Sequence, residues 1–409
     1  MRQRVKTRFG KFGCDNDEPP GSSFFTKLTM LEDEKMKKEM KKLGFGLMRL
    51  PEKDGSIDVE EATKLMDAFL SKGFTYFDTA YIYGSGQSER AFREAVVKRY
   101  PRDSFTITDK IPCMMLDREE QMEGFVTEML ERLGVDYFDY LWLHAINDAN
   151  YEKMEGLHAF EYLKAQKANG RAKEIGMSYH GSARLLDQIL AVHPEIAYVQ
   201  LQINYCDWTD ANIQSRDCYQ VCEKYDRPVI VMEPVKGGSL HNLPEKADAL
   251  LKSMDAQMSN ASWAIRFAAS LPKVMVVLSG MSNMEQVQDN ISYMENFVPL
   301  TEEEQAACIK AGTILRAETA IPCTACRYCV SECPMKIAIP DYFSVYNNLK
   351  RFGMKSDSDI WNYFLNLVKM HGKPSDCIGC GACEARCPQK LPIRDNLKTI
   401  TNELEKRFV

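Results

Sequence analysis

Residues 73–99 read GFTYFDTAYIYGSGQSERAFREAVVKR and contain the unit from which most of the chain is built. The short apolar run Phe74–Phe77 has the length and composition of a buried β-strand. The amphipathic stretch Ser88–Arg99 has the spacing of a helix that covers such a strand on one side. A polar loop joins the two. The segment therefore predicts one strand–loop–helix unit of an α/β fold.

The same unit recurs between Leu43 and Asn296. The eight apolar runs are Leu43–Met48, Phe74–Phe77, Phe105–Thr108, Tyr137–Leu143, Ala172–Met177, Ala197–Gln202, Pro228–Met232 and Val274–Leu278. The eight amphipathic stretches are Val59–Leu70, Ser88–Arg99, Arg118–Leu133, Glu152–Ala168, Ser182–Val192, Asn212–Tyr225, Ser259–Ala269 and Met284–Met294. This alternation over about 250 residues matches the size of a (β/α)8 TIM barrel.

A doubly wound open sheet has the same alternation and is the alternative fold. Such a sheet usually has nearer six strands and carries a glycine-rich phosphate-binding turn. Here the first apolar run is followed by Met48-Arg49-Leu50-Pro51, without a GxGxxG motif. The barrel is therefore favoured.

The chain divides into four parts on composition. Residues 1–42 form a polar N-terminal extension to which the sequence assigns no role, and residues 43–298 form the barrel. Thr301 and Glu304 have the spacing of a capping box, which predicts a linker helix over 299–317. Residues 318–409 are rich in cysteine at both ends and predict a second domain, mostly α-helical, with helices at Asp341–Arg351 and Asp357–Met370.

Eight of the 14 cysteines fall in two runs, each with the spacing CxxCxxCxxxCP. In bacterial ferredoxins the fourth cysteine of such a run binds the other cluster. This spacing predicts one [4Fe-4S] cluster at Cys323, Cys326, Cys329 and Cys387, and a second at Cys377, Cys380, Cys383 and Cys333. Two zinc sites with four thiolates each are the less favoured alternative. The helical insert between the runs resembles the all-helical ferredoxin domains of dehydrogenases.

Polar residues follow the predicted strands where catalytic groups of a barrel lie. Asp78, Lys110 and His144 come after the second, third and fourth runs, and Tyr83 lies in the second loop. A lysine ammonium favours the ionised form of a nearby tyrosine, which makes the phenol a better acid. Asp78 would hold the ammonium, and His144 would orient a carbonyl. This set suits carbonyl reduction, with Tyr83 as general acid.

The chain resembles the aldo-keto reductase family in four stretches: GFTYFDTAYIYG (73–84), TDK (108–110), LWLH (141–144) and GRAKEIGMS (170–178). The resemblance implies a catalytic tetrad of Asp78, Tyr83, Lys110 and His144, and a nicotinamide held by Ser178 and Gln200. The chain departs from the family at Tyr179, where asparagine is frequent, and around Glu233, where an aromatic residue often stacks on the nicotinamide.

Further residues are candidates for binding the dinucleotide. Glu233, Pro234, Lys236 and Gly237 would line the pyrophosphate, because glycine allows close backbone approach. Ser279 and Gly280, which follow the eighth run, are further candidates for cofactor binding, and Asn283, Gln286 and Asn290 would face the adenine end. A 2′-phosphate generally needs a basic side chain, and the stretch from Ser279 to Asn290 contains none. The sequence therefore favours NAD(H), or use of both NAD(H) and NADP(H).

These features predict an NAD(P)-dependent oxidoreductase that moves hydride between NAD(P)H and a small carbonyl or alcohol, with clusters that exchange electrons with a partner protein. A nicotinamide transfers two electrons and each cluster transfers one, so direct coupling normally needs a flavin or another two-electron/one-electron switch. The chain shows no flavin motif, although a barrel could bind a flavin without one. The alternatives are a carbonyl reductase with structural clusters, and a non-catalytic regulatory or electron-transfer module.

Composition excludes other classes of function. Lys and Arg number 52 against 58 Asp and Glu, a net charge of −6 that does not suit nucleic-acid binding. The apolar runs are too short for the roughly 18–20 residues of a membrane-spanning helix. The basic N-terminus lacks the apolar core of a secretory signal. We therefore expect a cytoplasmic protein.

Overall fold

The computed structural model describes residues 40–211, 213–352, 364–365 and 367–406. Residues from Lys41 onward form one compact unit. The predicted N-terminal extension falls almost wholly outside the described residues. Among the residues that are described, no helix is both long and apolar enough to cross a lipid bilayer.

Eight parallel strands close into a barrel in the order β1-β10-β9-β8-β7-β6-β5-β4. The strands are β1 (Leu43–Gly46), β4 (Tyr76–Asp78), β5 (Thr106–Ile111), β6 (Phe138–Ile146), β7 (Ala172–Tyr179), β8 (Tyr198–Gln202), β9 (Val229–Met232) and β10 (Val274–Ser279). Each one overlaps a predicted apolar run. The predicted TIM barrel is confirmed.

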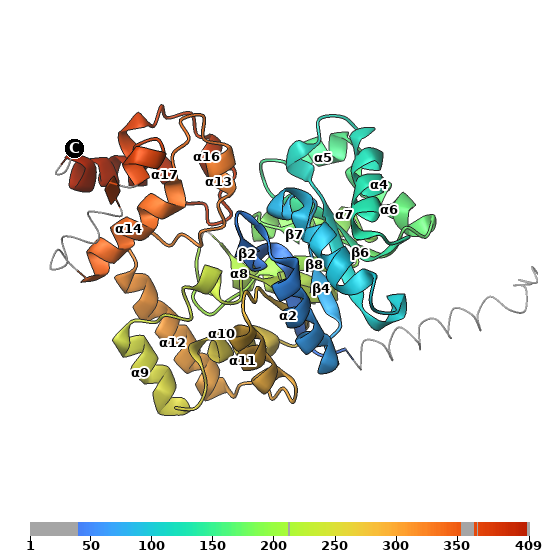
Figure 1. Ribbon diagram of the computed structural model, residues 1–409, viewed down its shortest axis with the longest axis horizontal. Helices are drawn as coiled ribbons and strands as arrows, with labels where there is room; N and C mark the ends of the chain where they lie inside the picture. The colour runs from blue at the N-terminus through green and yellow to red at the C-terminus, as the bar shows by residue number, and fades with distance from the viewer. Residues whose placement is uncertain (1–39, 212, 353–363, 366, 407–409) are drawn as a thin grey trace, which may run out of the picture. The chain divides into compact units, whose positions relative to one another are not determined.

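Helices surround the barrel strands (Figure 1). They are α2 (Val59–Ser71), α3 (Gln87–Phe92), α4 (Gln121–Leu133), α5 (Tyr151–Gly156), α6 (Ala159–Ala168), α7 (Ala183–Val192), α8 (Ser215–Lys224), α9 (Glu245–Met254), α10 (Asn260–Ala269) and α11 (Met284–Met294). Ser182, Ser259 and Asn283 cap α7, α10 and α11, since each side-chain oxygen accepts a backbone N–H of the first turn.

Three helix predictions need correction. The stretch predicted as one helix from Glu152 to Ala168 breaks before α6, where His158 has a φ of +52° that a helix does not accept. The helix predicted over Ser88–Arg99 leaves α-helical geometry after Phe92 and continues as a π-helical turn, Arg93–Val97. The helix predicted from Asn212 begins at Ser215.

The sequence analysis also missed two elements. Helix α9 was not predicted, and neither was a small antiparallel hairpin of β2 (Glu52–Lys53) and β3 (Ser56–Ile57). Strands of two residues are too short to show a period of two in the sequence.

The predicted linker helix is α12 (Glu302–Glu318), and it packs against α9 and α10 of the barrel. Its capping box is present, because Thr301 and Glu304 each accept the other's backbone N–H through a side-chain oxygen. The apolar face of α12 places Cys308 and Ala311 in one buried cluster with Trp263 of α10.

The C-terminal region is mostly helical, with α13 (Tyr328–Ser331), α14 (Ile339–Phe352), α16 (Ala382–Ala385), α17 (Ile393–Ile400) and a π-helical turn, Thr401–Glu405. Its own core includes Tyr342, Phe364 and Leu397. Helix α14 confirms the prediction at Asp341–Arg351. The predicted helix Asp357–Met370 lies largely in residues 353–363 and 366, outside the described part of the chain.

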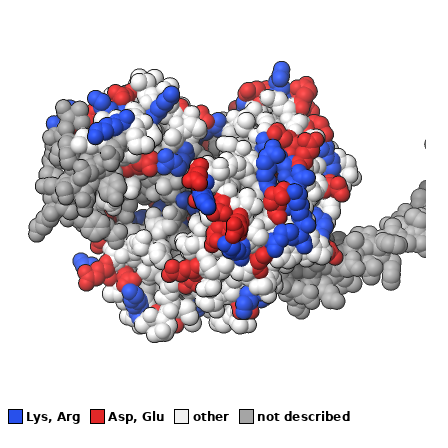
Figure 2. Space-filling model, in the orientation of Figure 1, with Lys and Arg blue, Asp and Glu red and all other residues white. Residues whose placement is uncertain are grey.

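Basic and acidic side chains are intermixed on the face of the molecule drawn in Figure 2. The described residues include many exposed ion pairs, such as Lys98 with Glu94 and Arg99 with Asp67. Exposed pairs of this kind contribute little to stability, about 0–1 kcal/mol each. The three buried hydrophobic clusters of the described residues therefore carry most of the stabilisation.

Candidate active site

Asp78 and Lys110 form a buried ion pair at the carboxyl ends of neighbouring strands. Asp78 ends β4, and Lys110 lies near the end of β5. The Lys110 Nζ lies 2.5 Å from Asp78 Oδ1 and 2.6 Å from the Thr79 carbonyl oxygen. Gln200 of β8 donates to Asp78 Oδ2 across 3.0 Å. Burial raises the pKa of Asp78, while Lys110 and Gln200 oppose that rise.

Tyr83 and His144 lie beside this pair. Tyr83 begins the 3-10 turn Tyr83–Gly86, and the centre of its ring is 5.1 Å from Lys110 Nζ. The His144 ring packs edge-on against the Tyr83 ring, with 5.9 Å between the ring centres. The structure thus brings together the four residues of the predicted tetrad, which the sequence places on three separate strand–loop segments.

Burial sets the protonation states of these two rings. It raises the pKa of Tyr83 well above the usual value, so the phenol keeps its proton at neutral pH. Burial, reinforced by the Lys110 charge, lowers the pKa of His144 well below its usual value. A neutral imidazole is a suitable hydrogen-bond partner for a carbonyl substrate. The buried His144 Nδ1 has no partner among the described residues.

A cavity of about 870 Å³ opens at this end of the barrel. Asp78, Tyr83 and His144 line it, and Lys110 lies behind them with no exposed surface. Ten of the candidate dinucleotide-binding residues also line it: Ser178, Gln200, Glu233, Pro234, Gly237, Ser279, Gly280, Asn283, Gln286 and Asn290.

The cavity fits a dinucleotide in size and in the polar groups it offers. It extends from Tyr83 to the first turn of α11, where Asn283 is the N-cap, and a helix N-terminus favours an anionic group. The buried Glu233 Oε2 lacks a partner among the described residues. Several candidates are already engaged within the protein: Ser178 Oγ accepts from Ala145 N, and Asn290 donates to Ser279.

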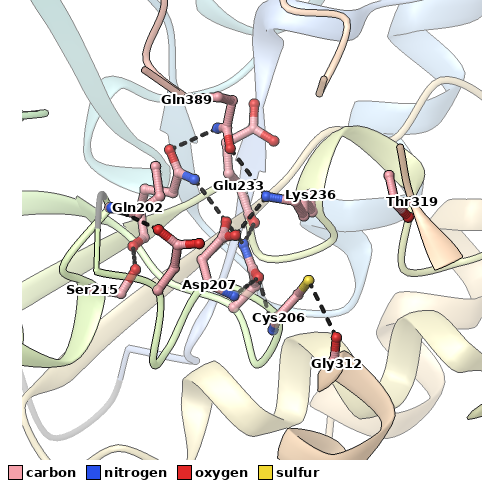
Figure 3. A network of polar contacts seen from close by, with 12 residues as sticks. Gln202, Cys206, Asp207, Ser215, Glu233, Lys236, Gly312, Thr319 and Gln389 are labelled. Atoms are coloured by element: carbon pink, nitrogen blue, oxygen red, sulfur yellow. Dashed lines mark hydrogen bonds and ion pairs between the residues drawn. The ribbon is translucent and has the colours of Figure 1, made fainter. Parts of the chain in front are cut away.

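Lys236 does not line the cavity, unlike the other candidates. Its Nζ lies 2.5 Å from Asp207 Oδ1 and 3.0 Å from Gln389 Oε1, as Figure 3 shows. The predicted contact between Lys236 and a pyrophosphate therefore finds no support in the geometry. Asp207 lies 29 residues earlier in the sequence and pairs with the Lys236 ammonium, so this side chain contacts Asp207 and not the cavity.

The four cysteines predicted for the second cluster line a common small cavity: Cys333, Cys377, Cys380 and Cys383. Cys333 belongs to the first run and the other three to the second, as the cross-pairing predicts. Thiols gathered around one space are the donor set that an iron–sulfur cluster requires.

The remaining four cysteines also lie close together. Burial raises the pKa of Cys329, and the neighbouring thiolates of Cys326, Cys323 and Cys387 add to that rise. Burial likewise raises the pKa of Cys326 to about 11, again with contributions from Cys387 and Cys323. Because the cationic iron–sulfide core of a bound cluster would offset this repulsion, the arrangement fits the ligand set predicted for the first cluster.

The sequence analysis missed several residues of the cavity. Arg49 follows β1 and lines the cavity, so the strand-end rule that found Asp78 would also have found it. Cys326, Tyr328 and Pro388 of the C-terminal region line it too. No local pattern marks these last three as cavity residues, since their contacts with the barrel join distant parts of the chain.

Comparison with known proteins places these features in a family. The model of the aldo/keto reductase family matches residues 42–312, and a model described as a 4Fe-4S dicluster domain matches residues 322–391. YqkF of Bacillus subtilis (strain 168), an uncharacterized oxidoreductase, is 24% identical over 301 residues, 65% of this chain and 90% of that protein. A probable aldo-keto reductase of Glycine max is 29% identical over 181 residues, 42% of this chain and about half (49%) of that protein.

Solved structures share the fold of the barrel. The holo form of aldo-keto reductase AKR11C1 from Bacillus halodurans has a TM-score of 0.55 at 23% identity, covering 66% of this chain and 91% of that one. An aldo/keto reductase from Klebsiella pneumoniae in complex with NADP and acetate has a TM-score of 0.55 at 18% identity, covering 68% and 92%. The chain therefore belongs to the aldo/keto reductase family of oxidoreductases and carries a C-terminal 4Fe-4S dicluster domain.

Proposed function

We propose that the protein transfers hydride between NAD(P)H and a small carbonyl or alcohol, with Tyr83 as the general acid. The observation that carries this proposal is the convergence of Tyr83, His144 and the buried Lys110–Asp78 pair on one wall of the cavity. A bound nicotinamide would supply the hydride. The residues of the chain have to bind the carbonyl, orient it and protonate its oxygen.

The proton comes from Tyr83. In the reduction, the carbonyl carbon accepts the hydride and the carbonyl oxygen takes the phenol proton, which gives the alcohol. The Lys110 ammonium, 5.1 Å from the centre of the Tyr83 ring, favours the phenolate left behind. Asp78 fixes the position of that ammonium through the 2.5 Å contact. His144, neutral because of its burial, orients the carbonyl oxygen.

For the nucleotide, we propose use of both NAD(H) and NADP(H), with weak discrimination. Residues from Ser279 to Asn290 include no lysine or arginine for a 2′-phosphate. Arg49 lines the same cavity, although its Nη2 donates to the Thr324 carbonyl oxygen. Comparing the dissociation constants of NADH and NADPH tests this directly.

The cysteines support two [4Fe-4S] clusters that exchange single electrons with a partner protein. Cys380 is exposed, and the neighbouring Ile378 has 65% of its surface exposed. A small exposed apolar surface beside ligand residues suits the transient contact of an electron-carrier protein. Cys326, one of the four cysteines predicted for the first cluster, lines the cavity of the barrel.

A carbonyl reductase with structural clusters is the second candidate, favoured by the contacts between the barrel and the loops that carry cluster ligands. Thr324, next to Cys323, accepts a hydrogen bond from Arg49, and Gln389, two residues after Cys387, bonds to Lys236. A cluster that shapes these loops would support catalysis without moving electrons.

The proposed hydride transfer is tested with protein that has been purified anaerobically and contains its full complement of iron. NADH and NADPH binding is followed by fluorescence, and nucleotide oxidation is measured with a panel of aldehydes and ketones. Tyr83→Phe should lower turnover by about 10²–10⁴-fold, the usual contribution of a general acid. Tyr81→Phe is the matched control, because the Tyr81 hydroxyl donates to Glu128 and does not line the cavity.

Electron paramagnetic resonance separates the two candidates for the clusters. Signals that appear when NAD(P)H and a carbonyl or alcohol are added would support electron exchange with the site. Signals that appear only with dithionite, together with full carbonyl reduction, would favour structural clusters. Equal turnover of Tyr83→Phe and the unmodified protein would refute the proposed chemistry.

A further inference from the structure

Three large apolar side chains are exposed near the cysteines of the second cluster. They are Met335, Met370 and Ile378, and Met370 has 75% of its surface exposed. The other exposed side chains of this kind in the described residues belong to the barrel: Val59, Met115, Val192 and Val298. Apolar side chains that gather at one place on a surface mark a contact site, whereas single scattered ones do not.

Backbone contacts bring the segments that carry these side chains together. Met335 and Ile378 both line the small cavity that the four cysteines of the second cluster share. Gly372, two residues after Met370, donates its N–H to the Lys336 carbonyl oxygen across 3.1 Å. A Cβ on Gly372 would lie 2.1 Å from the Met335 carbonyl oxygen, so the two segments are in close contact.

Three lysines lie among the apolar side chains. Lys336 follows Met335 in the chain, Lys369 precedes Met370, and Lys373 lies three residues further on. Lys336 and Lys369 are exposed, and Lys373 is partly exposed. Within the described part of the chain, none of the three ammonium groups has an ion-pair partner. The six residues are called the docking surface below: Met335, Lys336, Lys369, Met370, Lys373 and Ile378.

The carboxylates near this surface are engaged in contacts of their own. Asp376 Oδ2 accepts a backbone N–H of its own turn across 2.7 Å. Glu405 is buried and accepts from the backbone N–H and the hydroxyl of Ser375. Glu384 pairs with Arg394 at 2.7 Å. An approaching protein therefore meets free ammonium groups on the docking surface, although the whole chain has a net charge of −6.

We propose that the docking surface binds an acidic protein that carries one electron at a time, such as a small ferredoxin or a flavodoxin. This inference rests on the proposed electron exchange of the clusters and names the partner for it. In the step, the reduced second cluster loses one electron and the oxidised carrier gains it. No bond forms or breaks, and the reverse step reduces the cluster.

The two kinds of side chain have different roles in such a contact. The lysines attract an acidic carrier from a distance and raise its association rate, by about 10–10³-fold in steered pairs. The apolar side chains exclude water once the two proteins touch, and a small contact area keeps the complex short-lived. Ile378 directly follows Cys377, so the contact forms beside a predicted cluster ligand. Nucleic acids also attract lysines, but the exposed apolar side chains favour a protein partner.

Binding is measured by isothermal titration calorimetry of the anaerobic holoprotein with oxidised flavodoxin of net negative charge. The dissociation constant should rise at least about 10-fold with added salt, because the screening length falls from about 30 Å at 0.01 M to about 3 Å at 1 M. At low salt, the triple variant Lys336→Glu, Lys369→Glu, Lys373→Glu should bind at least about 10-fold more weakly.

A second triple variant with the same net charge is the matched control: Lys164→Glu, Lys246→Glu, Lys310→Glu. These exposed lysines lie on α6, α9 and α12, away from the docking surface in the sequence. Their replacement should leave the dissociation constant within about twofold, since the effect depends on charge at the contact. Iron content and visible absorption of each variant show that the clusters are loaded.

Electron transfer is followed by stopped flow after the dithionite-reduced holoprotein is mixed with a carrier. With oxidised flavodoxin, the first triple variant should form the semiquinone at least about 10-fold more slowly than the unmodified protein at low salt. With oxidised cytochrome c, a basic carrier, the order should be reversed. Carbonyl reduction with NAD(P)H should be the same in all three proteins, because none of the changed residues lines the reaction cavity.

The outcomes separate this inference from the proposed function. If both triple variants bind flavodoxin and reduce it equally well, the inference is wrong and the electron exchange stands. If neither carrier takes electrons from the reduced holoprotein, the proposed electron exchange fails, and the inference fails with it. Tighter binding of a DNA duplex than of flavodoxin would also overturn the inference.

Met370→Gln supplies a second test if the triple variant loses iron. Met370 lies seven residues before the nearest cysteine in sequence, Cys377, so its replacement leaves the ligand loops intact. The loss of an exposed apolar contact should weaken flavodoxin binding at least threefold. Unchanged binding of Met370→Gln, together with binding of the unmodified protein that does not depend on salt, would overturn the inference.

Discussion

The Arg49 guanidinium, in the turn that follows the first barrel strand, donates a hydrogen bond of 3.1 Å to the Thr324 carbonyl oxygen. Thr324 lies between the first two cysteines of the C-terminal domain. The barrel mouth and the first cysteine run are therefore in direct contact. Thr324 is 2% exposed, and the hydrogen bond itself is partly buried. A substitution in the barrel mouth should therefore affect the first cysteine run, and a substitution in that run should affect the barrel mouth.

Replacement of Gly237 by alanine should weaken this contact. The added Cβ would lie 2.2 Å from the Thr324 carbonyl oxygen. In addition, the φ of +62° at this position is unfavourable for alanine. Gly170→Ala is the matched control, because its φ is +83° and nothing lies within 4 Å of the added atom. We expect Gly237→Ala to lower the free energy of unfolding by about 2 kcal/mol or more relative to Gly170→Ala. A loss of this size is typical of an overpacked site.

Thermal unfolding and hydrogen exchange of residues 323–329 measure the effect of Gly237→Ala. Faster exchange in this segment, with a lower midpoint than Gly170→Ala, is the expected pattern. Identical exchange in the two variants would show that the segment does not depend on the barrel.

Lys110→Met should both inactivate and destabilise the protein. The substitution leaves Asp78 as an unpaired charge that is 3% exposed. Breaking a buried ion pair in this way costs about 3–5 kcal/mol. The double variant Asp78→Asn with Lys110→Met should regain much of that stability without regaining activity. Urea unfolding and turnover of the three proteins test this, and a double variant no more stable than Lys110→Met would contradict it.

The buried carboxyls of Glu89 and Asp109 should make stability depend on pH. Glu89 Oε1 and Asp109 Oδ2 are both buried, and neither has a hydrogen-bond partner among the described residues, while Glu89 Oε2 pairs with Arg132. Burial raises the pKa of Glu89 to about 7. The folded protein therefore binds a proton that the unfolded chain releases above about pH 4.5.

The contribution of this pair to the free energy of unfolding should thus be largest below about pH 4.5. It should fall as the pH rises through about 7. The loss should be about 2–3 kcal/mol between pH 5 and 8. Glu89→Gln should flatten the profile, because an amide donates at every pH. Glu94→Gln, at an exposed pair with Lys98, is the control. If the free energy of unfolding of Glu89→Gln depends on pH as steeply as that of the unmodified protein, this pair is not the source of the pH dependence.

Removal of single cysteines should distinguish the two clusters. Cys326 lines the reaction cavity, whereas Cys380 is exposed and lines only the small cysteine cavity among those described. Both Cys326→Ser and Cys380→Ser should lower iron content. We expect carbonyl reduction to fall at least 10-fold in Cys326→Ser and to stay within about threefold in Cys380→Ser. The reverse order would place the reaction beside the other cluster.

The sequence predicted the barrel and its tetrad for the same reason. Parallel strands end at one mouth, so residues after separate apolar runs converge there. This rule brought Asp78, Lys110 and His144 together correctly and would have found Arg49. The sequence could not predict the contacts of a side chain where its partner is distant in the sequence. The glycines beside Lys236 predicted that its segment lines a pyrophosphate, but the Lys236 side chain pairs with the distant Asp207. Tyr328 had no local pattern to mark it as a cavity residue.

The most direct measurement is single-turnover transfer of deuterium from the reduced nicotinamide, labelled at C4, to the carbonyl carbon of a substrate, in the anaerobic holoprotein and in Tyr83→Phe. We predict that deuterium appears on the product carbon with the unmodified protein, and that Tyr83→Phe slows the transfer by at least about 100-fold. Transfer at the same rate in both proteins, or a product that carries no deuterium, would contradict hydride transfer assisted by Tyr83.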